Sequence, residues 1–226
     1  MQINIVNKPL PLPEAILFDM DGLLLDTEKV AKHAFFYSCE KIKFSCSDEE
    51  YAQLSGHGSV LRDKLLVSIL PKDTNIALFN KIWWEYFQKN LNYEVPVKEG
   101  ALEFLEYLYS QKIKIAVATS SYTLSAETLL TRAKLRSFIG FIIGGDQVKN
   151  AKPAPDIYLK AASCVNAEVS TCIAFEDSDV GVIAAHAAGV PVIQIPDIKI
   201  PSEKCKALGH LIFDSLERAR DGLGWR

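Results

Sequence analysis

The feature that most constrains the fold is an apolar run that ends abruptly in acidic residues. Residues 15–18 form this run, and Asp19-Met20-Asp21-Gly22 follows it directly. A short continuous apolar run bounded by polar and glycine residues is typical of a strand buried on both faces. Four later segments have the same form, each ending in polar, glycine or proline residues: 113–118, 138–143, 171–175 and 190–195.

Helical patterns separate these predicted strands, at residues 101–111, 123–135, 155–165 and 180–188. Strands that alternate with helices predict a mostly parallel sheet with helices on both faces. The predicted fold class is therefore α/β, with a Rossmann-like doubly wound parallel sheet. Ligands of such sheets bind beyond the carboxyl ends of the strands, which is where the polar residues of this chain fall.

A helical insert interrupts this alternation after the first predicted strand. The stretch from Thr27 to about Val95 is too long for one crossover helix, and a capping box from Ser47 to Glu50 begins one of its helices. We predict a core of residues 1–28 and 95–226 and a small helical cap domain of residues 29–94. Four aromatic residues are expected to pack between the cap helices, with stacking on a substrate base as the other interpretation: Trp83, Trp84, Tyr86 and Phe87.

Length and charge narrow the class of partner. At 226 residues the chain is long enough for one large core and an accessory domain. A net charge of -3 without a basic block argues against nucleic acid or a membrane surface as a partner. The five cysteines are scattered, the first fourteen residues lack the pattern of a signal peptide, and no apolar run reaches the roughly 20 residues of a membrane span. We expect a cytoplasmic protein, a monomer or weak dimer, that acts on small molecules.

The paired carboxylates after the first strand are the first candidate catalytic groups. In an extended strand Asp19 and Asp21 would point to opposite faces, so a turn at Gly22 is needed to bring both near one ligand. Taken alone, the D-x-D-G pattern is also found in solvated turns and in calcium loops. The chemistry therefore depends on what the other strand ends contribute.

Three further strand ends contribute polar groups of the kind that binds phosphate and metal. Thr119 offers a hydroxyl before a helix whose amide groups can bind an anion, and Lys152 precedes the next helix. Glu176 and Asp177 end the fourth predicted strand. Several carboxylates at one edge of the sheet would repel one another unless a cation joined them. Their oxygens favour a hard cation, for which magnesium is the first choice.

Four segments carry a family resemblance, in this order along the chain: 18–28, 118–121, 152–153 and 175–178 with Gly181. They resemble the first to fourth motifs of the haloacid dehalogenase superfamily, in its phosphatase branch with a helical cap after the first motif. The similarity extends from about Ala15 to near Phe213. Because four motifs occur in the family order, the resemblance is specific.

The resemblance implies a phosphatase that acts on a small phosphorylated metabolite, such as a sugar phosphate, a polyol phosphate or a nucleoside monophosphate. Asp19 would be the nucleophile that forms an aspartyl-phosphate, and Asp21 would be the acid/base. Magnesium would be held by Asp19, the backbone carbonyl of Asp21, Asp177 and Glu176. The phosphoryl group would be bound by Thr119, Ser120 and Lys152.

Residues of the insert bear on substrate specificity and on the alternative functions of the chain. His57 and Arg62 are candidate substrate-binding residues, because the resemblance implies a cap loop directed toward the substrate; plain solvent exposure is the other interpretation. A phosphomutase of the same fold is the first alternative, but Ala31 stands where the sugar-phosphate mutases of this family carry a histidine. A dehalogenase would have no use for an acid at Asp21, and a non-catalytic binding protein would not need the complete set of carboxylates.

Overall fold

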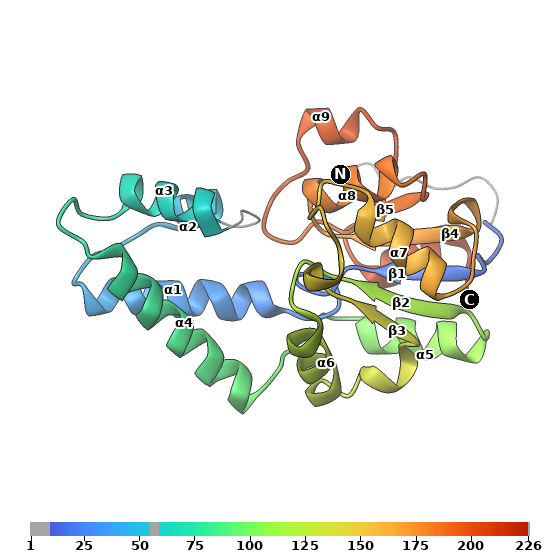
Figure 1. Ribbon diagram of the computed structural model, residues 1–226, viewed down its shortest axis with the longest axis horizontal. Coiled ribbons are helices and arrows are strands. Elements are labelled where there is room, and N and C mark those ends of the chain that lie inside the picture. Colours follow the sequence, from blue (N-terminus) through green and yellow to red (C-terminus); the bar gives the residue numbers. More distant parts are fainter. Residues whose placement is uncertain (1–9, 55–58, 226) are drawn as a thin grey trace. The chain divides into compact units, whose positions relative to one another are not determined.

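The computed structural model describes residues 10–54 and 59–225 (Figure 1). Contacts between its residues divide the chain into two units. We call Met1–Leu25 with Val97–Arg226 the core unit and Asp26–Pro96 the insert unit. The cap limits predicted from the sequence, 29–94, fall inside the insert unit.

The core unit contains one parallel sheet, which confirms the predicted fold class. Its strands lie in the order β3-β2-β1-β4-β5-β6. In the pairing register Phe18 of β1 lies opposite Val117 of β2 and Phe175 of β4, so these three central strands end within one residue of the same level. The strands are β1 (Ala15–Phe18), β2 (Lys114–Ala118), β3 (Phe141–Ile143), β4 (Cys172–Glu176), β5 (Val192–Gln194) and β6 (Leu211–Ile212).

Helices cover both faces of this sheet (Figure 1). Because side chains alternate along a strand, Ala15 and Leu17 pack in the cluster formed with α7 and α8, whereas the Phe18 ring contacts Phe104 of α5 on the other face. The helices of the core unit are α5 (Ala101–Ser110), α6 (Thr123–Arg132), α7 (Asp156–Cys164), α8 (Asp179–Ala187), α9 (Glu203–Lys206) and α10 (Leu216–Leu223). Short 3-10 turns cover Arg136–Phe138, Gly145–Gln147 and Val169–Thr171.

The sequence analysis missed the end of the core and misplaced two strand starts by more than one residue. The strand expected over 190–195 begins at Val192. The strand expected over 138–143 begins at Phe141, because residues 136–138 form a 3-10 turn. The short strand β6 and the helices α9 and α10 were not predicted. For α10 a signal was present: Ser215 caps its start by accepting a hydrogen bond from the Arg218 N–H, and Leu216, Ala219 and Leu223 are buried at helical spacing.

The described elements of the insert unit are all helices: α1 (Thr27–Lys41), α2 (Asp48–Leu54), α3 (Ser59–Ile69) and α4 (Ile76–Tyr93). The predicted capping box is confirmed, since the Ser47 N–H donates to Glu50 Oε2 at 2.8 Å and the Glu50 N–H donates to Ser47 Oγ at 3.2 Å. Reciprocal bonds of this kind satisfy amide groups that the first turn of a helix leaves without a partner.

Aromatic side chains form the centre of the insert unit. Trp83 is buried among Phe35, Tyr51 and Phe79, and its indole N–H donates to the Ala31 carbonyl at 2.9 Å. The expectation that every aromatic residue of α4 packs between helices was wrong for Trp84. Its side chain is 61% exposed, because consecutive positions on a helix point about 100° apart and Trp83 takes the buried direction.

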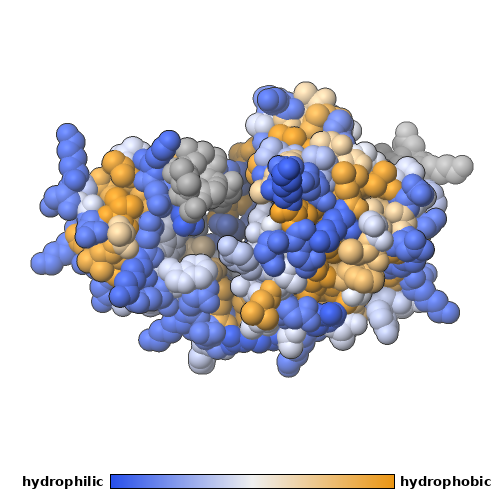
Figure 2. Space-filling model, viewed as in Figure 1, coloured by the Kyte–Doolittle hydropathy of each residue, from blue (hydrophilic) through white to orange (hydrophobic). Residues whose placement is uncertain are grey.

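Figure 2 shows hydrophilic side chains over much of the visible face, broken by smaller apolar areas. Among the residues that the structure describes, no helix combines the length and apolar character that a membrane span requires.

Candidate active site

A tight turn follows β1, and it gives Asp19 and Asp21 different neighbours. Asp19 continues the sheet by one residue, since its N–H donates to the Phe175 carbonyl at 2.9 Å. The chain then reverses at Gly22, which has a φ of 87° and donates its N–H to the Leu25 carbonyl at 2.8 Å. Glycine adopts this left-handed conformation without strain. The turn expected from the sequence is therefore present.

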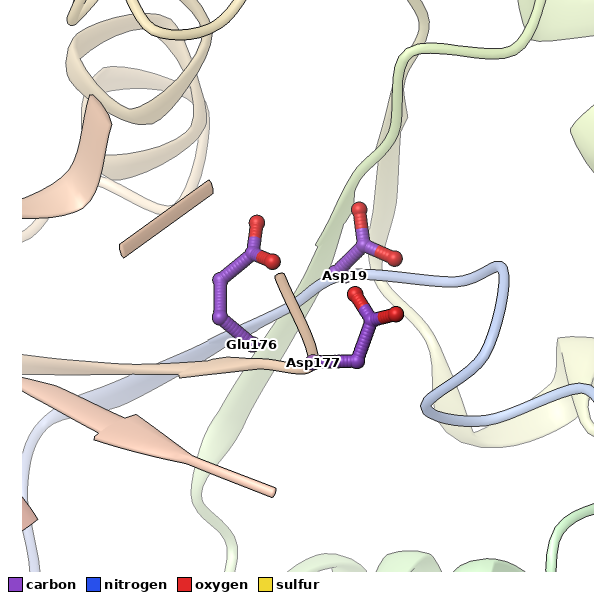
Figure 3. Close-up of side chains that lie close together, drawn as sticks. All are labelled: Asp19, Glu176 and Asp177. Carbon is purple, nitrogen blue, oxygen red and sulfur yellow. The ribbon is translucent and has the colours of Figure 1, made fainter. Parts of the chain in front are cut away.

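Three carboxylates meet at the ends of β1 and β4 (Figure 3). Glu176 is the last residue of β4 and Asp177 follows it, while Asp19 follows β1. One ligand oxygen from each of these residues lies within 4.8 Å of the others. Figure 3 shows the three carboxylate groups pointing to the same side of the strand ends. Their separation is that of groups that can share one metal ion.

Lys152 joins two of these carboxylates from the loop before α7. Its Nζ lies 2.6 Å from Asp19 Oδ1, 2.6 Å from Glu176 Oε1 and 2.9 Å from the Ala118 carbonyl. The side chain of Lys152 is only 6% exposed, and that of Glu176 is fully buried. Such short, desolvated ion pairs are strongly oriented. The lysine predicted to lie over the strand ends is therefore in contact with the first carboxylate.

Two residues that the sequence analysis missed hold Glu176 in place. The buried Tyr158 of α7 donates its hydroxyl to Glu176 Oε1, and Ser178 donates its hydroxyl to Oε2 at 3.2 Å. Ser178 also caps α8 by accepting a bond from the Gly181 N–H. Ser178 was quoted only as part of a motif, and Tyr158 carries no local signal that would separate it from an ordinary core tyrosine.

The site carries more negative charge than its lysine neutralises. Burial raises the pKa of Asp19 to about 7, against the opposing charge of Lys152 and with further upward contributions from Glu176 and Asp21. Burial, and then the charges of Asp19 and Glu176, also hold the pKa of Asp177 well above its ordinary value. Burial opposes the charge on Lys152, yet the carboxylates of Asp19 and Glu176 keep its pKa well above the usual range. The lysine is thus cationic and the carboxylates need a further positive charge.

The surroundings of Asp177 fit a divalent cation. A Cβ on Gly22 would come within 2.5 Å of Asp177 Oδ2, so the backbone can approach this carboxylate closely only because residue 22 has no side chain. The oxygens that Asp177, Asp19 and Glu176 bring together are carboxylate oxygens, which hard cations prefer. The described residues therefore fit a divalent metal ion, as the sequence analysis predicted in general terms.

Asp21 faces a pair of hydroxyl groups. Its carboxylate is not one of the three that meet at the ends of β1 and β4. Its Oδ2 accepts hydrogen bonds from Ser121 Oγ at 2.9 Å and from Thr119 Oγ1 at 3.3 Å. Thr119 is fully buried and also accepts a bond from the Ser121 N–H. Ser120, which the sequence analysis named, is exposed, whereas Ser121 was missed. The role of the Asp21 backbone carbonyl as a ligand stays a prediction.

The structure describes only one of the two candidate substrate-binding residues of the insert, His57 and Arg62. His57 lies outside the described residues. The Arg62 guanidinium lies over the Trp83 ring, 5.2 Å from its centroid, so it takes part in the packing of the insert unit. A contact of either residue with substrate stays a prediction.

Comparisons with known proteins identify the family of this chain. A family model described as haloacid dehalogenase-like hydrolase matches residues 16–195. A phosphorylated carbohydrates phosphatase of Thermotoga maritima is 32% identical over 177 residues, which cover 78% of this chain and 82% of that protein. A Drosophila melanogaster protein provisionally named pseudouridine-5'-phosphatase is 33% identical over 210 residues, 88% of each chain.

A solved structure shows that the similarity extends over both units. It is a Thermotoga maritima protein provisionally described as a beta-phosphoglucomutase, with 29% identity and a TM-score of 0.78, covering 93% of this chain and 98% of that chain. The resemblance and the phosphoric monoester hydrolase class inferred from the sequence are confirmed. The chain belongs to the haloacid dehalogenase-like hydrolase family.

Proposed function

We propose that this protein is a magnesium-dependent phosphatase that hydrolyses a small phosphorylated metabolite through a phosphorylated Asp19. The observation that carries the proposal is the meeting of Asp19, Glu176 and Asp177 with Lys152 at one end of the sheet. The names of the relatives, among them a phosphorylated carbohydrates phosphatase, support the same reaction class.

Asp19 is the nucleophile in this proposal. Its carboxylate is buried, is held by Lys152, and follows the central strand of the sheet. Attack on phosphorus requires the ionised form, and the Lys152 ammonium favours that form against the effect of burial. The same ammonium offsets part of the charge of an incoming phosphoryl group.

Asp21 is the general acid and then the general base. The hydroxyls of Thr119 and Ser121 hold one oxygen of its carboxyl group, which fixes the orientation of the side chain. In the first half-reaction Asp21 gives a proton to the leaving oxygen, and in the second it takes a proton from the water that attacks the phosphoryl group on Asp19.

Asp19, Asp177 and Glu176, with the backbone carbonyl of Asp21, would hold the magnesium ion. When bound, the ion supplies positive charge that lets an anionic carboxylate approach an anionic phosphate ester. Glu176 has a second task, because its oxygens already accept bonds from Lys152, Tyr158 and Ser178. Its main contribution is then to position Lys152 against Asp19.

The first experiment tests the reaction and its nucleophile. Purified protein is assayed for phosphate release on sugar, polyol and nucleoside phosphates, with magnesium or with EDTA. We expect turnover only with magnesium, near-complete loss of turnover in Asp19→Asn, and accumulation of phosphoenzyme in Asp21→Asn with a good leaving group such as p-nitrophenolate. Full turnover in EDTA, or in verified Asp19→Asn, would refute the proposal. The exposed Asp214→Asn is the matched control.

A phosphomutase is the second candidate, favoured by the solved structure described as a beta-phosphoglucomutase. Ala31 opposes it, because its side chain cannot serve as the histidine expected there in a mutase. We expect inorganic phosphate to appear in step with loss of substrate, without activation by a sugar bisphosphate. Isomerisation of a sugar monophosphate without phosphate release would favour the mutase. If His57 and Arg62 bind substrate, replacing either by alanine should change KM or substrate preference more than turnover of a small generic ester.

A further inference from the structure

An ion pair beside the carboxylate cluster has no role in the mechanism above. Lys98 Nζ lies 2.6 Å from Asp197 Oδ1, and the two side chains are 24% and 13% exposed. Asp197 stands in the loop after β5. Lys98 stands where the chain returns from the insert unit, with its N–H donated to the Leu24 carbonyl at 3.0 Å. The pair thus joins two loops at the carboxyl edge of the sheet.

The second oxygen of Asp197 is the unusual one. Oδ2 is buried and has no hydrogen-bond partner among the described residues. It lies within 3.2 Å of the point where a Cβ on Gly22 would stand, and Asp177 Oδ2 lies within 2.5 Å of the same point. The two carboxylates therefore both pack against the backbone of residue 22, an approach that is possible because this residue is a glycine.

Two carboxylate oxygens that are held close together away from water are unfavourable unless a donor or a cation lies nearby. Lys98 neutralises Asp197 from the other side, through Oδ1, and so leaves Oδ2 able to accept a bond. A magnesium ion keeps several waters when carboxylates bind it, and those waters are strong hydrogen-bond donors. Asp197 Oδ2 is a hydrogen-bond acceptor fixed near Asp177, and it is therefore placed to orient such a water.

We propose that Asp197 is a positioning residue for the metal site: its Oδ2 accepts a hydrogen bond from the hydration shell of the cation bound by Asp19 and Asp177. Lys98 only neutralises the other oxygen of Asp197 and is not needed for this bond. This inference rests on the metal dependence of the proposed function. It assigns Asp197 no contact with substrate and no part in proton transfer.

The competing explanation is structural, with the pair serving only to tie the two loops together. The two explanations predict different magnesium affinities for the two variants. If the pair is only a tie, Asp197→Asn and Lys98→Met should lower stability alike and leave magnesium affinity unchanged. If Asp197 orients the hydration shell, Asp197→Asn should weaken magnesium binding, whereas Lys98→Met removes a positive charge near the site and should bind magnesium as well as the parent or more tightly.

The test is a thermal melt of each protein over a series of magnesium concentrations, which reports binding without turnover. We expect the midpoint concentration to rise about tenfold or more in Asp197→Asn, as for other residues that support metal ligands. Asp197→Ser is a second variant in case the first does not fold, and the exposed Asp214→Asn should match the parent.

The outcomes separate this inference from the proposed function. If the parent shows no magnesium-dependent stabilisation and turns over in EDTA, both fail. If the parent binds and requires magnesium, but Asp197→Asn and Asp197→Ser keep the parent midpoint, only the role of Asp197 is overturned. Equal weakening of magnesium binding in Asp197→Asn and Lys98→Met would overturn it as well.

Discussion

The backbone of Gly181 packs directly against the carboxylate of Glu176. Replacing Gly181 by alanine therefore tests how firmly that carboxylate is held. A Cβ on Gly181 would overlap the Glu176 carboxylate, which is fully buried. The carboxylate cannot move without cost, because it accepts hydrogen bonds from Lys152, Tyr158 and Ser178. We expect Gly181→Ala to displace Glu176 and break part of this network while leaving the sheet intact.

The size of the effect follows from these contacts. A hydrogen bond to a charged group contributes about 1.5–3 kcal/mol, and overpacking a buried site costs about 1–3 kcal/mol. Alanine favours a helix over glycine by up to about 1 kcal/mol, which offsets part of the loss because Gly181 lies in the first turn of α8. The free energy of unfolding should therefore fall by about 2–4 kcal/mol in the single variant.

The assay is urea unfolding of the parent, Gly181→Ala, Glu176→Ala and the double variant. Once Glu176 is alanine, no carboxylate remains to be displaced, so adding Gly181→Ala should be neutral or should stabilise by up to about 1 kcal/mol. The sign of the glycine substitution thus reverses between the two backgrounds. An equal loss of stability in both backgrounds would show that the overlap with Glu176 is not the cause.

Three further predictions concern the hydroxyls, the charge and the insert. Ser121→Ala should lower kcat/KM for phosphate release about tenfold by removing a bond to Asp21, while Ala at the exposed Ser120 should change it by less than about twofold. Burial raises the pKa of Asp19 to about 7 in the folded protein, from an ordinary 3.8. Between these pH values the folded protein holds a proton that the unfolded chain has lost, so the metal-free protein should lose stability as pH rises from 3.8 to about 7. Magnesium should therefore raise the melting temperature more at about pH 8 than at about pH 5.5, and an equal rise at both would contradict the charge argument. Trp83→Ala should cost about 3–5 kcal/mol in urea unfolding, whereas Trp84→Ala, at the exposed neighbouring position, should cost less than about 1 kcal/mol; similar losses would contradict the assigned packing.

Much of the fold could be predicted because the strands that form the site are short, apolar and followed at once by polar residues. Residues 15–18 were placed without error, since Asp19 breaks the apolar run at the position where β1 ends. In contrast β6 has only two residues, and the apolar run 211–213 that contains it is too short to indicate a strand, so its pairing with β5 depends on tertiary context.

The candidate site could be predicted only where the residues lie in a local motif. Asp19, Asp21 and Thr119 follow strands and Glu176 ends one, and the parallel sheet brings strand ends together. Tyr158 lies in the first turn of α7, so its bond to Glu176 depends on how this helix packs on the sheet. The pairing of Lys98 with Asp197 joins positions 99 residues apart, which no local pattern indicates.

The paired ends of the insert have a consequence for how the chain folds. The Asp26 N–H donates to the Pro96 carbonyl at 2.9 Å, and Leu25 bridges to Val97, so the chain leaves and re-enters the core at one place. The neighbouring strands β1 and β2 can pair only after this long loop closes, and the entropy lost on closure grows with the logarithm of loop length. An insert that folds early brings its own ends together and shortens the effective loop. The same geometry lets an insert of different sequence or size occupy this position during evolution without shifting the register of any strand.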